Sequence, residues 1–522
     1  MNCAQPVGLR IRKWYQIIGL PLAFALACGR SRGPHLPLDN SVTVAVESAP
    51  AQLDPRMGAD QASERAHELL FDGLVEWDRH ARLVPALAES WEELDGGKRW
   101  RFHLRPGVRF HDGRELSAAD VVWTLSSVLD GTVATSKRGA LGALQSVVAV
   151  DPLTVDLLLT APSPVLLAEL TSGLGIVPRR ASAAEMNLRP IGTGPFRFVG
   201  QSADRLELAS NPTAFRGVPA IGSLVLKAVA DTTVRALEMR KGGAQLVIND
   251  LAPDAVPTFR DDPRFQVIEE PGASFVYLGF NFTDPALAVR GVRQAIARAI
   301  DRAQIVRSLW RGQGVVSETI FAPGHWARND TLPGVPFDPA EARRQLDAAG
   351  FPDPDGDGPR PRLHLVYKTS TAEQSQLQAQ AVQAMLGAVG IEVEIRTLEF
   401  ATLYDDIKRG DFQLFSLTRT AVLEPNIYRL MLHSQSFPPA GQNRGRYTNV
   451  AFDALIDQAE QSSDVARRRQ LYGEAQRVFA EDLPYLILLV KDNVAVLPRE
   501  LAGYAHYPSG AFTALRALRW ER

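Results

Sequence analysis

The sequence predicts an α/β protein, because segments with the two-residue period of strands alternate with segments typical of helices. Near the start, Val42, Val44 and Val46 form a strand pattern that precedes a helix expected over residues 61–71. After His364, a strand, a Gln/Ala-rich helix and a second strand follow in the same order. This repeated order indicates sheets that are covered by helices.

Residues 99–110 carry the clearest strand pattern. Trp100, Phe102 and Leu104 alternate with charged residues, as in a strand with one buried face. The alternation returns at Val108 and Phe110 after a Pro-Gly turn, which predicts a second short strand.

A helix start follows directly. Ser117 has the character of an N-cap, and Asp120 stands at the third helical position of a capping box. Leu116 and Val121 are spaced as a hydrophobic staple around it. Further along the chain we expect a strand over 277–282, helices over 292–300, 340–350 and 467–482, and an apolar segment over 483–490.

Composition limits the possible functions. The chain has 522 residues, of which 45% are hydrophobic and 22% are charged, so there is room for two or three globular domains. A formal net charge of −2 gives no indication of a nucleic-acid partner. Both cysteines, Cys3 and Cys28, precede the main body, which therefore has no disulfide and no cysteine nucleophile or ligand.

The N-terminus has the pattern of a secretory signal. Basic residues within 10–13 precede an apolar run over 14–27, which is short for a membrane span. The run ends at Cys28 and resembles a bacterial lipobox, although Ala25 stands where a larger aliphatic residue is usual. Cleavage after Ala27 without lipidation is the alternative. We expect a lipoprotein signal peptide over 1–28, lipidation of Cys28 and a tether over 29–40.

The sequence contains no complete motif for catalysis or for metal binding. His67 and Glu68 begin a zinc-protease pattern, but its second histidine is missing. Residues 353–358 resemble the start of a calcium loop, but the twelfth position is His364 instead of glutamate. We therefore predict no enzyme, no cofactor and no metal, and we expect His103 and His111 to face outward from neighbouring strands.

Several motifs together resemble those of the extracytoplasmic solute-binding proteins of family 5, the peptide-, oligopeptide- and nickel-binding components of ABC importers. They occur at 53–55, 69–75, 85–91, 102–113, 118–122 and 192–196. The last of these, Gly-Thr-Gly-Pro-Phe, is glycine-rich but has Pro195, which removes a donor amide, and no following lysine. It is therefore interpreted as a backbone turn and not as a phosphate loop.

The resemblance implies a two-lobed periplasmic-binding-protein-like α/β fold with an extra subdomain inserted in the first lobe. Ligand would bind in the cleft and close the lobes around a hinge. Mapped on this chain, lobe I comprises 41–60, 190–272 and 488–522, the inserted subdomain 61–189, and lobe II 273–487.

The resemblance also directs attention to residues 415–425. Peptide-binding relatives have an aspartate here that pairs with the α-amino group of the peptide. Alignment on Glu424-Pro425 puts Ala421 at that position and Thr418 where a tryptophan is usual. A peptide amine is therefore not expected to bind in the usual way, since a buried ammonium without a carboxylate is costly.

The remaining candidate residues surround this run. Arg419, if it points into the cleft, favours a carboxylate or another anion. The alternative is a solvated strand residue, with a carboxylate elsewhere replacing the missing aspartate. The expected ligand-binding residues are Ser48, Ala49, Arg138, Tyr277, Thr418, Arg419, Thr420 and Ala421, although Tyr277 also fits simple core packing.

These observations predict an extracytoplasmic receptor that delivers a small, peptide-like solute to ABC permease subunits. We expect a monomer that is held at the membrane by the lipid on Cys28. A nickel-chelate or haem receptor is one alternative, and a surface lipoprotein with an adhesive or chaperone role is another.

Overall fold

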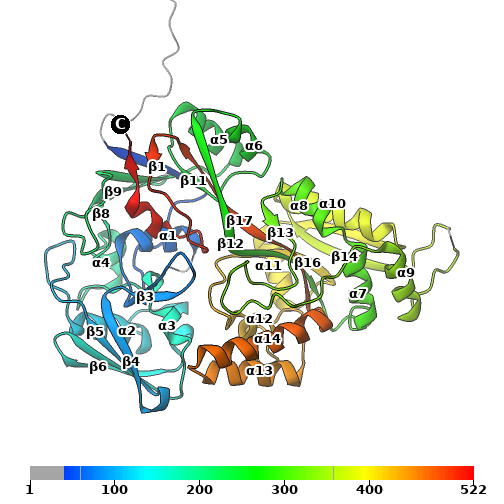
Figure 1. Cartoon of the computed structure of the whole chain (residues 1–522), viewed down its shortest axis with the longest axis horizontal. Helices are drawn as coiled ribbons and strands as arrows, with labels where there is room; N and C mark the ends of the chain where they lie inside the picture. The colour runs from blue at the N-terminus through cyan, green and yellow to red at the C-terminus, as the bar shows by residue number, and fades with distance from the viewer. Residues whose placement is uncertain (1–39, 59, 357, 522) are drawn as a thin grey trace, which may run out of the picture. The chain divides into compact units, whose positions relative to one another are not determined.

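A computed structural model describes residues 40–58, 60–356 and 358–521 of the chain. The predicted signal peptide, Cys28 and residues 29–39 of the predicted tether lie outside these ranges. Within them, helices and strands alternate along most of the sequence, as predicted (Figure 1). None of the helices in the described ranges has the length and apolar character needed to cross a membrane.

The first sheet contains one strand near residue 41 and three strands within residues 196–228. Its strand order is β1-β10-β9-β8, with β1 parallel to β10 and the other neighbours antiparallel. The predicted first strand is confirmed as β1, and the predicted helix as α1. The bounds are β1 Ser41–Val46, α1 Gln61–Leu70, β8 Phe196–Gln201, β9 Arg205–Ser210 and β10 Ser223–Ala228.

A second sheet lies within the predicted inserted subdomain, in the order β4-β5-β7-β6. Trp100, Phe102 and Leu104 are buried on one face of β5, as their alternation predicts. The helix α2 begins at Ala118, and the backbone amide of Ser117 donates to Asp120 Oδ2 at 2.8 Å. The bounds are β4 Ala88–Leu94, β5 Arg99–Leu104, α2 Ala118–Leu129, β6 Leu144–Asp151 and β7 Thr154–Leu159.

Two expectations for this region were wrong. Val108 and Phe110 are buried, but they flank a single isolated bridge between Arg109 and Glu115 and do not form a strand. His111 does not face solvent: its Nε2 lies 3.2 Å from the carbonyl oxygen of Gly194, and its Nδ1 accepts from the backbone amide of Gly192. Val108 and Phe110 make local backbone hydrogen bonds with Leu116 and Arg114, whereas His111 packs against the glycine turn.

The predicted turn at residues 192–196 packs closely against the backbone at the end of α1. The amide of Gly194 donates to the carbonyl oxygen of Leu70 at 3.0 Å, at the end of α1. A Cβ atom on Gly192 would lie 2.0 Å from the same oxygen, so no larger residue fits there.

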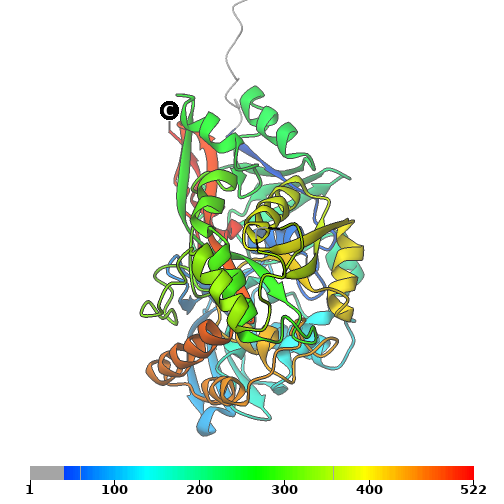
Figure 2. The same cartoon turned by 90° about the vertical axis from the view of Figure 1, so that its right-hand side faces the viewer.

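The third sheet is built around two long antiparallel strands, β12 and β17, which lie side by side in Figures 1 and 2. The sheet order is β11-β17-β12-β16-β14-β15, and β13 also pairs with β17. The predicted lobe boundaries at residues 272/273 and 487/488 fall inside these two strands. The bounds are β11 Val247–Ile248, β12 Phe265–Phe280, β13 Gly314–Val315, β14 Leu363–Ser370, β15 Ile391–Leu398, β16 Leu414–Arg419 and β17 Tyr485–Pro498.

Helices accompany this sheet, and those predicted after residue 290 are confirmed. The β-α-β order after His364 is also confirmed, with α10 connecting the parallel strands β14 and β15. The orange pair α13 and α14 lies side by side in Figures 1 and 2. The bounds are α7 Arg290–Ala299, α8 Arg302–Leu309, α9 Pro339–Ala348, α10 Glu373–Gly387, α11 Phe400–Arg409, α12 Ile427–Leu432, α13 Val450–Gln461 and α14 Val465–Asp482.

Short elements connect these parts. The strands are β2 Val75–Trp77, β3 Leu83–Pro85, β18 Leu501–Ala502 and β19 Arg519–Trp520; the helices are α3 Leu166–Glu169, α4 Ala183–Leu188, α5 Thr232–Lys241 and α6 Ala255–Arg260; and the 3₁₀ turns are Asp95–Gly97, Ser136–Leu141, Ser172–Leu174 and Phe512–Ala517.

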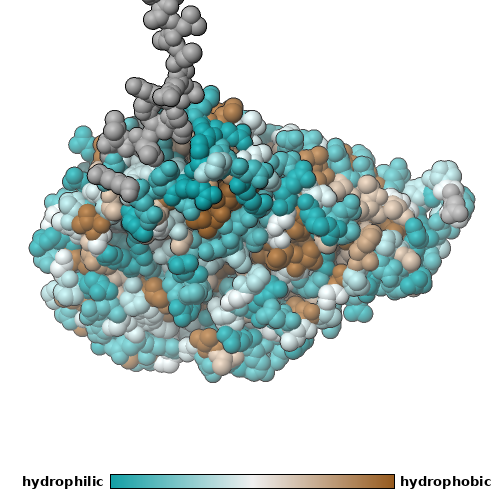
Figure 3. Space-filling model, turned by 45° about the horizontal axis from the view of Figure 1, so that its top comes forward, coloured by the Kyte–Doolittle hydropathy of each residue, from teal (hydrophilic) through white to brown (hydrophobic). Residues whose placement is uncertain are grey.

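The hydrophobic core is divided among the sheets. One cluster packs the first sheet against α1 and the C-terminal residues, with Leu69, Phe196 and Leu515 buried. A second fills the inserted region around Phe102 and Val121. Two more lie on either side of the third sheet. The face in Figure 3 is mainly hydrophilic, with scattered apolar residues, as expected for a globular surface.

Candidate ligand-binding pocket

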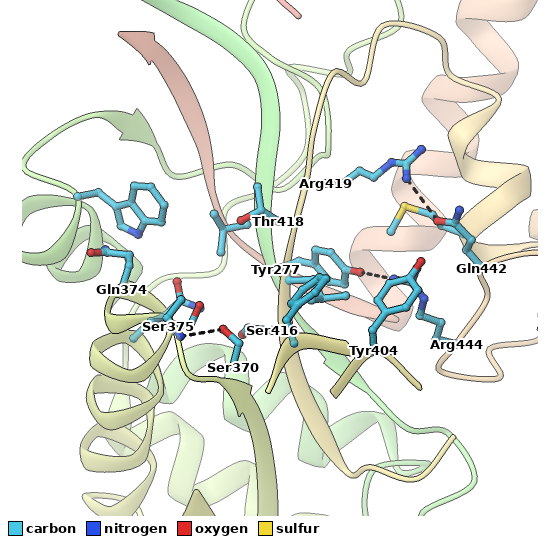
Figure 4. Close-up of a pocket in the computed structure, with 17 residues that line it drawn as sticks. Tyr277, Ser370, Gln374, Ser375, Tyr404, Ser416, Thr418, Arg419, Gln442 and Arg444 are labelled. Carbon is cyan, nitrogen blue, oxygen red and sulfur yellow. Dashed lines mark hydrogen bonds between the residues drawn. The ribbon is translucent and has the colours of Figure 1, made fainter. Parts of the chain in front are cut away.

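A pocket of about 400 Å³ opens beside the third sheet, and its lining residues lie between Val276 and Arg444 (Figure 4). They come from β12, the end of α8, β14, the start of α10, α11, β16, α12 and the loop before Arg446. Residues that are far apart in the sequence meet here because β12, β14 and β16 are neighbours in the sheet.

Arg444 supplies the most strongly held positive charge in the pocket. Its Nη2 donates to the Tyr404 hydroxyl at 2.7 Å, and Nη1 lies 3.4 Å from the hydroxyl of Tyr277 (Figure 4). Burial lowers the pKa of Arg444, but the neighbouring tyrosines outweigh this effect and raise the pKa overall. The guanidinium therefore stays charged and is fixed in direction.

Arg419 supplies a second positive charge with fewer partners. Its Nη1 lies 3.4 Å from Gln442 Oε1, and its buried Nε has no hydrogen-bond partner. Burial lowers the pKa of Arg419, and nearby Arg444 lowers it further, while Tyr277 and Tyr404 oppose the change. Among the described residues, no carboxylate forms an ion pair with Arg419 or with Arg444.

The rest of the lining is polar on one side and aromatic on the other. Ser370, Ser375 and Gln374 contribute hydroxyl and amide groups near the start of α10. Phe400 stacks on Tyr404 with the ring centres 5.9 Å apart. About half of the Phe400 surface is exposed. A solute can therefore contact hydrogen-bonding groups and an aromatic face at the same time.

The structure brings together some of the predicted binding residues. Tyr277, Thr418 and Arg419 line the pocket. Thr420 and Ala421 follow the end of β16 and are exposed, and they are not part of the lining. The Ala421 amide lies 3.4 Å from Ser274 Oγ, which holds the chain where it leaves the strand.

The other predicted residues lie apart from this lining. Ser48 and Ala49 follow β1; Ser48 is exposed and Ala49 is half-buried. Arg138 is exposed and donates to the carbonyl oxygen of Leu129. Its neighbour Lys137 is more enclosed and donates to the Pro55 carbonyl oxygen at 2.9 Å.

An acidic residue of α1 faces the same region. Burial raises the pKa of Glu64, and its neighbours Lys137 and Arg419 lower it. Glu64 is exposed to solvent, although protein atoms surround much of its side chain. Its charge in turn opposes the lowering of the Arg419 pKa.

Several pocket residues have no signal in the sequence. Arg444 and Gln442 lie in a loop without periodicity, and Tyr404 belongs to a helix with an ordinary amphipathic pattern. Among the described residues, no three potential ligand side chains cluster as a metal site.

Comparison with known proteins identifies the family. The model of bacterial extracellular solute-binding proteins, family 5, matches residues 82–436, more than half of the chain. The chain belongs to this family. This result confirms the predicted resemblance and the function as a solute-binding protein.

Relatives of this family 5 protein agree along nearly its whole length. Di/tripeptide-binding protein 4 of Pseudomonas aeruginosa is 30% identical over 94% of this chain and 96% of its own. Heme-binding protein A of Haemophilus influenzae is 26% identical over 90% of this chain and 91% of its own. Both relatives are binding proteins.

Solved structures of the family confirm the predicted two-lobed α/β fold. The oligopeptide-binding protein AppA from Bacillus subtilis, in complex with a nonapeptide, has a TM-score of 0.78 and 25% identity. The match covers 92% of this chain and 99% of that protein.

Proposed function

We propose that this protein is the extracytoplasmic receptor of an ABC importer and captures a small, peptide-like solute through an anionic group. One observation carries the anionic preference: Arg419 and Arg444 share a pocket and have no carboxylate partner among the described residues. Guanidinium groups bind carboxylates through paired, charge-assisted hydrogen bonds, so a solute carboxylate would supply what the pocket lacks.

The C-terminal carboxylate of a short peptide suits this arrangement, and the peptide-binding relatives support this class of ligand. The position aligned with the amine-binding aspartate of such proteins is Ala421, which has no charge to offer. The solute is therefore anchored by its carboxylate. If the solute has an amine, that amine is free or pairs with Glu64.

The cellular setting follows from family membership and from the N-terminal pattern. Solute would pass from the receptor to ABC permease subunits. The protein would act as a monomer outside the cytoplasm, tethered through a lipid on Cys28. An open cavity of about 400 Å³ supports a receptor over a surface lipoprotein with a filled cleft.

An anionic metal chelate or haem is the second candidate. The paired guanidinium groups and the aromatic side chains of Phe400 and Tyr404 suit such a ligand, and one relative is a heme-binding protein. Addition of haemin or of a nickel chelate to the purified protein would then raise the midpoint of thermal unfolding, whereas free peptides would not.

Native mass spectrometry of the gently purified protein tests the proposal. We expect a co-purified solute of low mass that carries at least one carboxylate and that is lost in the Arg444→Gln variant. Recovery of tightly bound peptides whose amine is essential and whose carboxylate can be amidated without loss would contradict it.

A further inference from the structure

A half-buried lysine lies on β17, one of the two long strands. Lys491 pairs in register with Ser274 of β12 and with Gly314 of β13. Its Nζ lies 4.9 Å from the centre of the Trp310 ring. Among the described residues its ammonium has no hydrogen bond and no ion pair.

The contact with Trp310 does not satisfy this ammonium. A lysine has three N–H donors, and one aromatic face attracts the charge from one direction only. Burial lowers the pKa of Lys491, and Asp250 opposes the change. Asp250 is itself paired with Arg65 at 2.7 Å, so it is not available as a direct partner.

A small hollow of about 40 Å³ lies next to Lys491. Asn249, Gln313 and Asp492 also line it, and Asp492 forms no ion pair with the lysine. Trp310 lines both this hollow and the larger pocket, so its side chain is the element that the two spaces share.

Trp310 has an unsatisfied donor of its own. The side chain is only 7% exposed, and its indole Nε1 is buried without a hydrogen-bond partner. The ammonium and the indole N–H, which both lack a protein acceptor, therefore belong to one Lys491–Trp310 contact, at the side chain that lines both spaces. Buried donors in native proteins normally have partners, so this indole N–H is available to an acceptor from outside the chain.

We propose that Lys491 and the indole N–H of Trp310 form a subsite for a second anionic group of the solute. The solute would then be a dianion, such as a dicarboxylate or an acidic short peptide, with one group at Arg419 and Arg444 and the other at Lys491. This inference rests on the proposed function, because it extends the same pocket. The competing explanation is that Lys491 only packs on the tryptophan ring.

The experiment compares two small acids of equal chain length, succinate with two carboxylates and butyrate with one. Their apparent dissociation constants come from the concentration dependence of the thermal midpoint at constant ionic strength and pH 7.5. We expect succinate to bind the wild type at least about tenfold more tightly, the size of one charge-assisted hydrogen bond.

Lys491→Met keeps the apolar stem but removes the charge, and should bring the ratio of the two constants close to one. Trp310→Phe keeps an aromatic ring but removes the N–H, and should reduce the ratio partly. Lys98→Met makes the same change at an exposed lysine of the inserted region and should leave the ratio unchanged. A circular dichroism spectrum close to that of the wild type shows that a variant is folded. If Lys491→Met is not folded, Lys491→Gln takes its place.

The inference is overturned if the wild type does not distinguish the two acids, or if the folded Lys491 variants distinguish them as the wild type does. Arg419→Gln separates this result from the proposed function. Weaker binding of both acids with the succinate preference retained supports both proposals. Unchanged binding of both acids contradicts the anionic pocket at Arg419, and the Lys491 variants then decide separately whether Lys491 binds an anion.

Discussion

Arg444 contacts Tyr404 in two ways: it donates to the hydroxyl at 2.7 Å, and its guanidinium carbon lies 4.8 Å from the centre of the same ring. The arginine is thereby fixed before a ligand arrives, which reduces the entropy lost on binding. It still has donors left for a solute, since a guanidinium carries five N–H groups.

Replacement of Arg444 by glutamine should weaken solute binding strongly. The loss of a charge-assisted contact costs about 1.5–3 kcal/mol, or roughly tenfold to a hundredfold in affinity. Isothermal titration with the solute identified by mass spectrometry measures this. Arg396→Gln, at an exposed arginine that pairs with Glu394 at 2.7 Å, is the matched control. Equal effects of both changes would show that the pocket arginine has no special role.

Tyr404→Phe should have a smaller effect, because it removes the hydroxyl but keeps the ring under Arg444. We expect a loss of about 0.5–1.5 kcal/mol in affinity, typical of one neutral hydrogen bond. Tyr404→Ala should cost more, since the ring contact is also lost. If the phenylalanine and alanine variants bind equally, the ring does not contribute to orienting the arginine.

The buried pair Asp54–Arg56 should be important for folding. Both side chains are fully buried, with Arg56 Nη2 at 2.7 Å from Asp54 Oδ2. Arg56→Met leaves a buried carboxylate without a charged partner, so we expect the free energy of unfolding to fall by about 3–5 kcal/mol. Arg82→Met breaks a pair of the same 2.7 Å length whose arginine is 66% exposed, and should cost less than about 1 kcal/mol. Urea unfolding of both variants measures the difference, and similar losses would refute the argument.

Acid should destabilise the protein through His67. Burial lowers the pKa of His67 to about 3, from an ordinary value near 6.5. Between these values the unfolded chain binds a proton that the folded chain does not, so stability falls as pH decreases, by up to about 1.4 kcal/mol per pH unit. His67→Gln should reduce this slope in urea titrations between pH 6.5 and 5, and His80→Gln, at an exposed histidine, should not.

Glu68 should have the opposite effect on the pH dependence of stability, because its contribution falls as pH rises. Burial raises its pKa to about 7, although the Phe512 amide donates to Oε2 at 2.6 Å. Its contribution to stability is therefore fully present below pH 4.5 and is lost as pH rises through 7. Relative to the wild type, Glu68→Gln should gain stability between pH 5 and 8 in the same assay. A constant difference over this range would contradict the shifted pKa.

Local pattern was sufficient to predict much of the fold. The alternation around Phe102 and the capping box at Ser117 depend on neighbours within a few residues, and both were confirmed. The environment of His111 was not predictable in this way, because its partners at Gly192 and Gly194 are about eighty positions further along the chain.

The pocket shows the same limit more strongly. Arg419 was found because it lies within the run aligned on Glu424-Pro425, and Tyr277 because it lies in a clear strand. Arg444 and Trp310 belong to the pocket only because the sheet brings β12, β14 and β16 together beside their loops. No spacing along the chain encodes such a meeting of distant segments.

The lining of the pocket by residues 276–444 has a kinetic consequence. In the predicted lobe division these residues belong to lobe II, so we expect a solute to meet Arg444 and Arg419 first and the association rate to depend on them. We expect contacts from predicted lobe I, which includes Lys491 of β17, to form on closure and to set the residence time. Substitutions on the two sides should therefore be separable: those near Arg444 change how fast a solute arrives, and those near Lys491 change how long it stays.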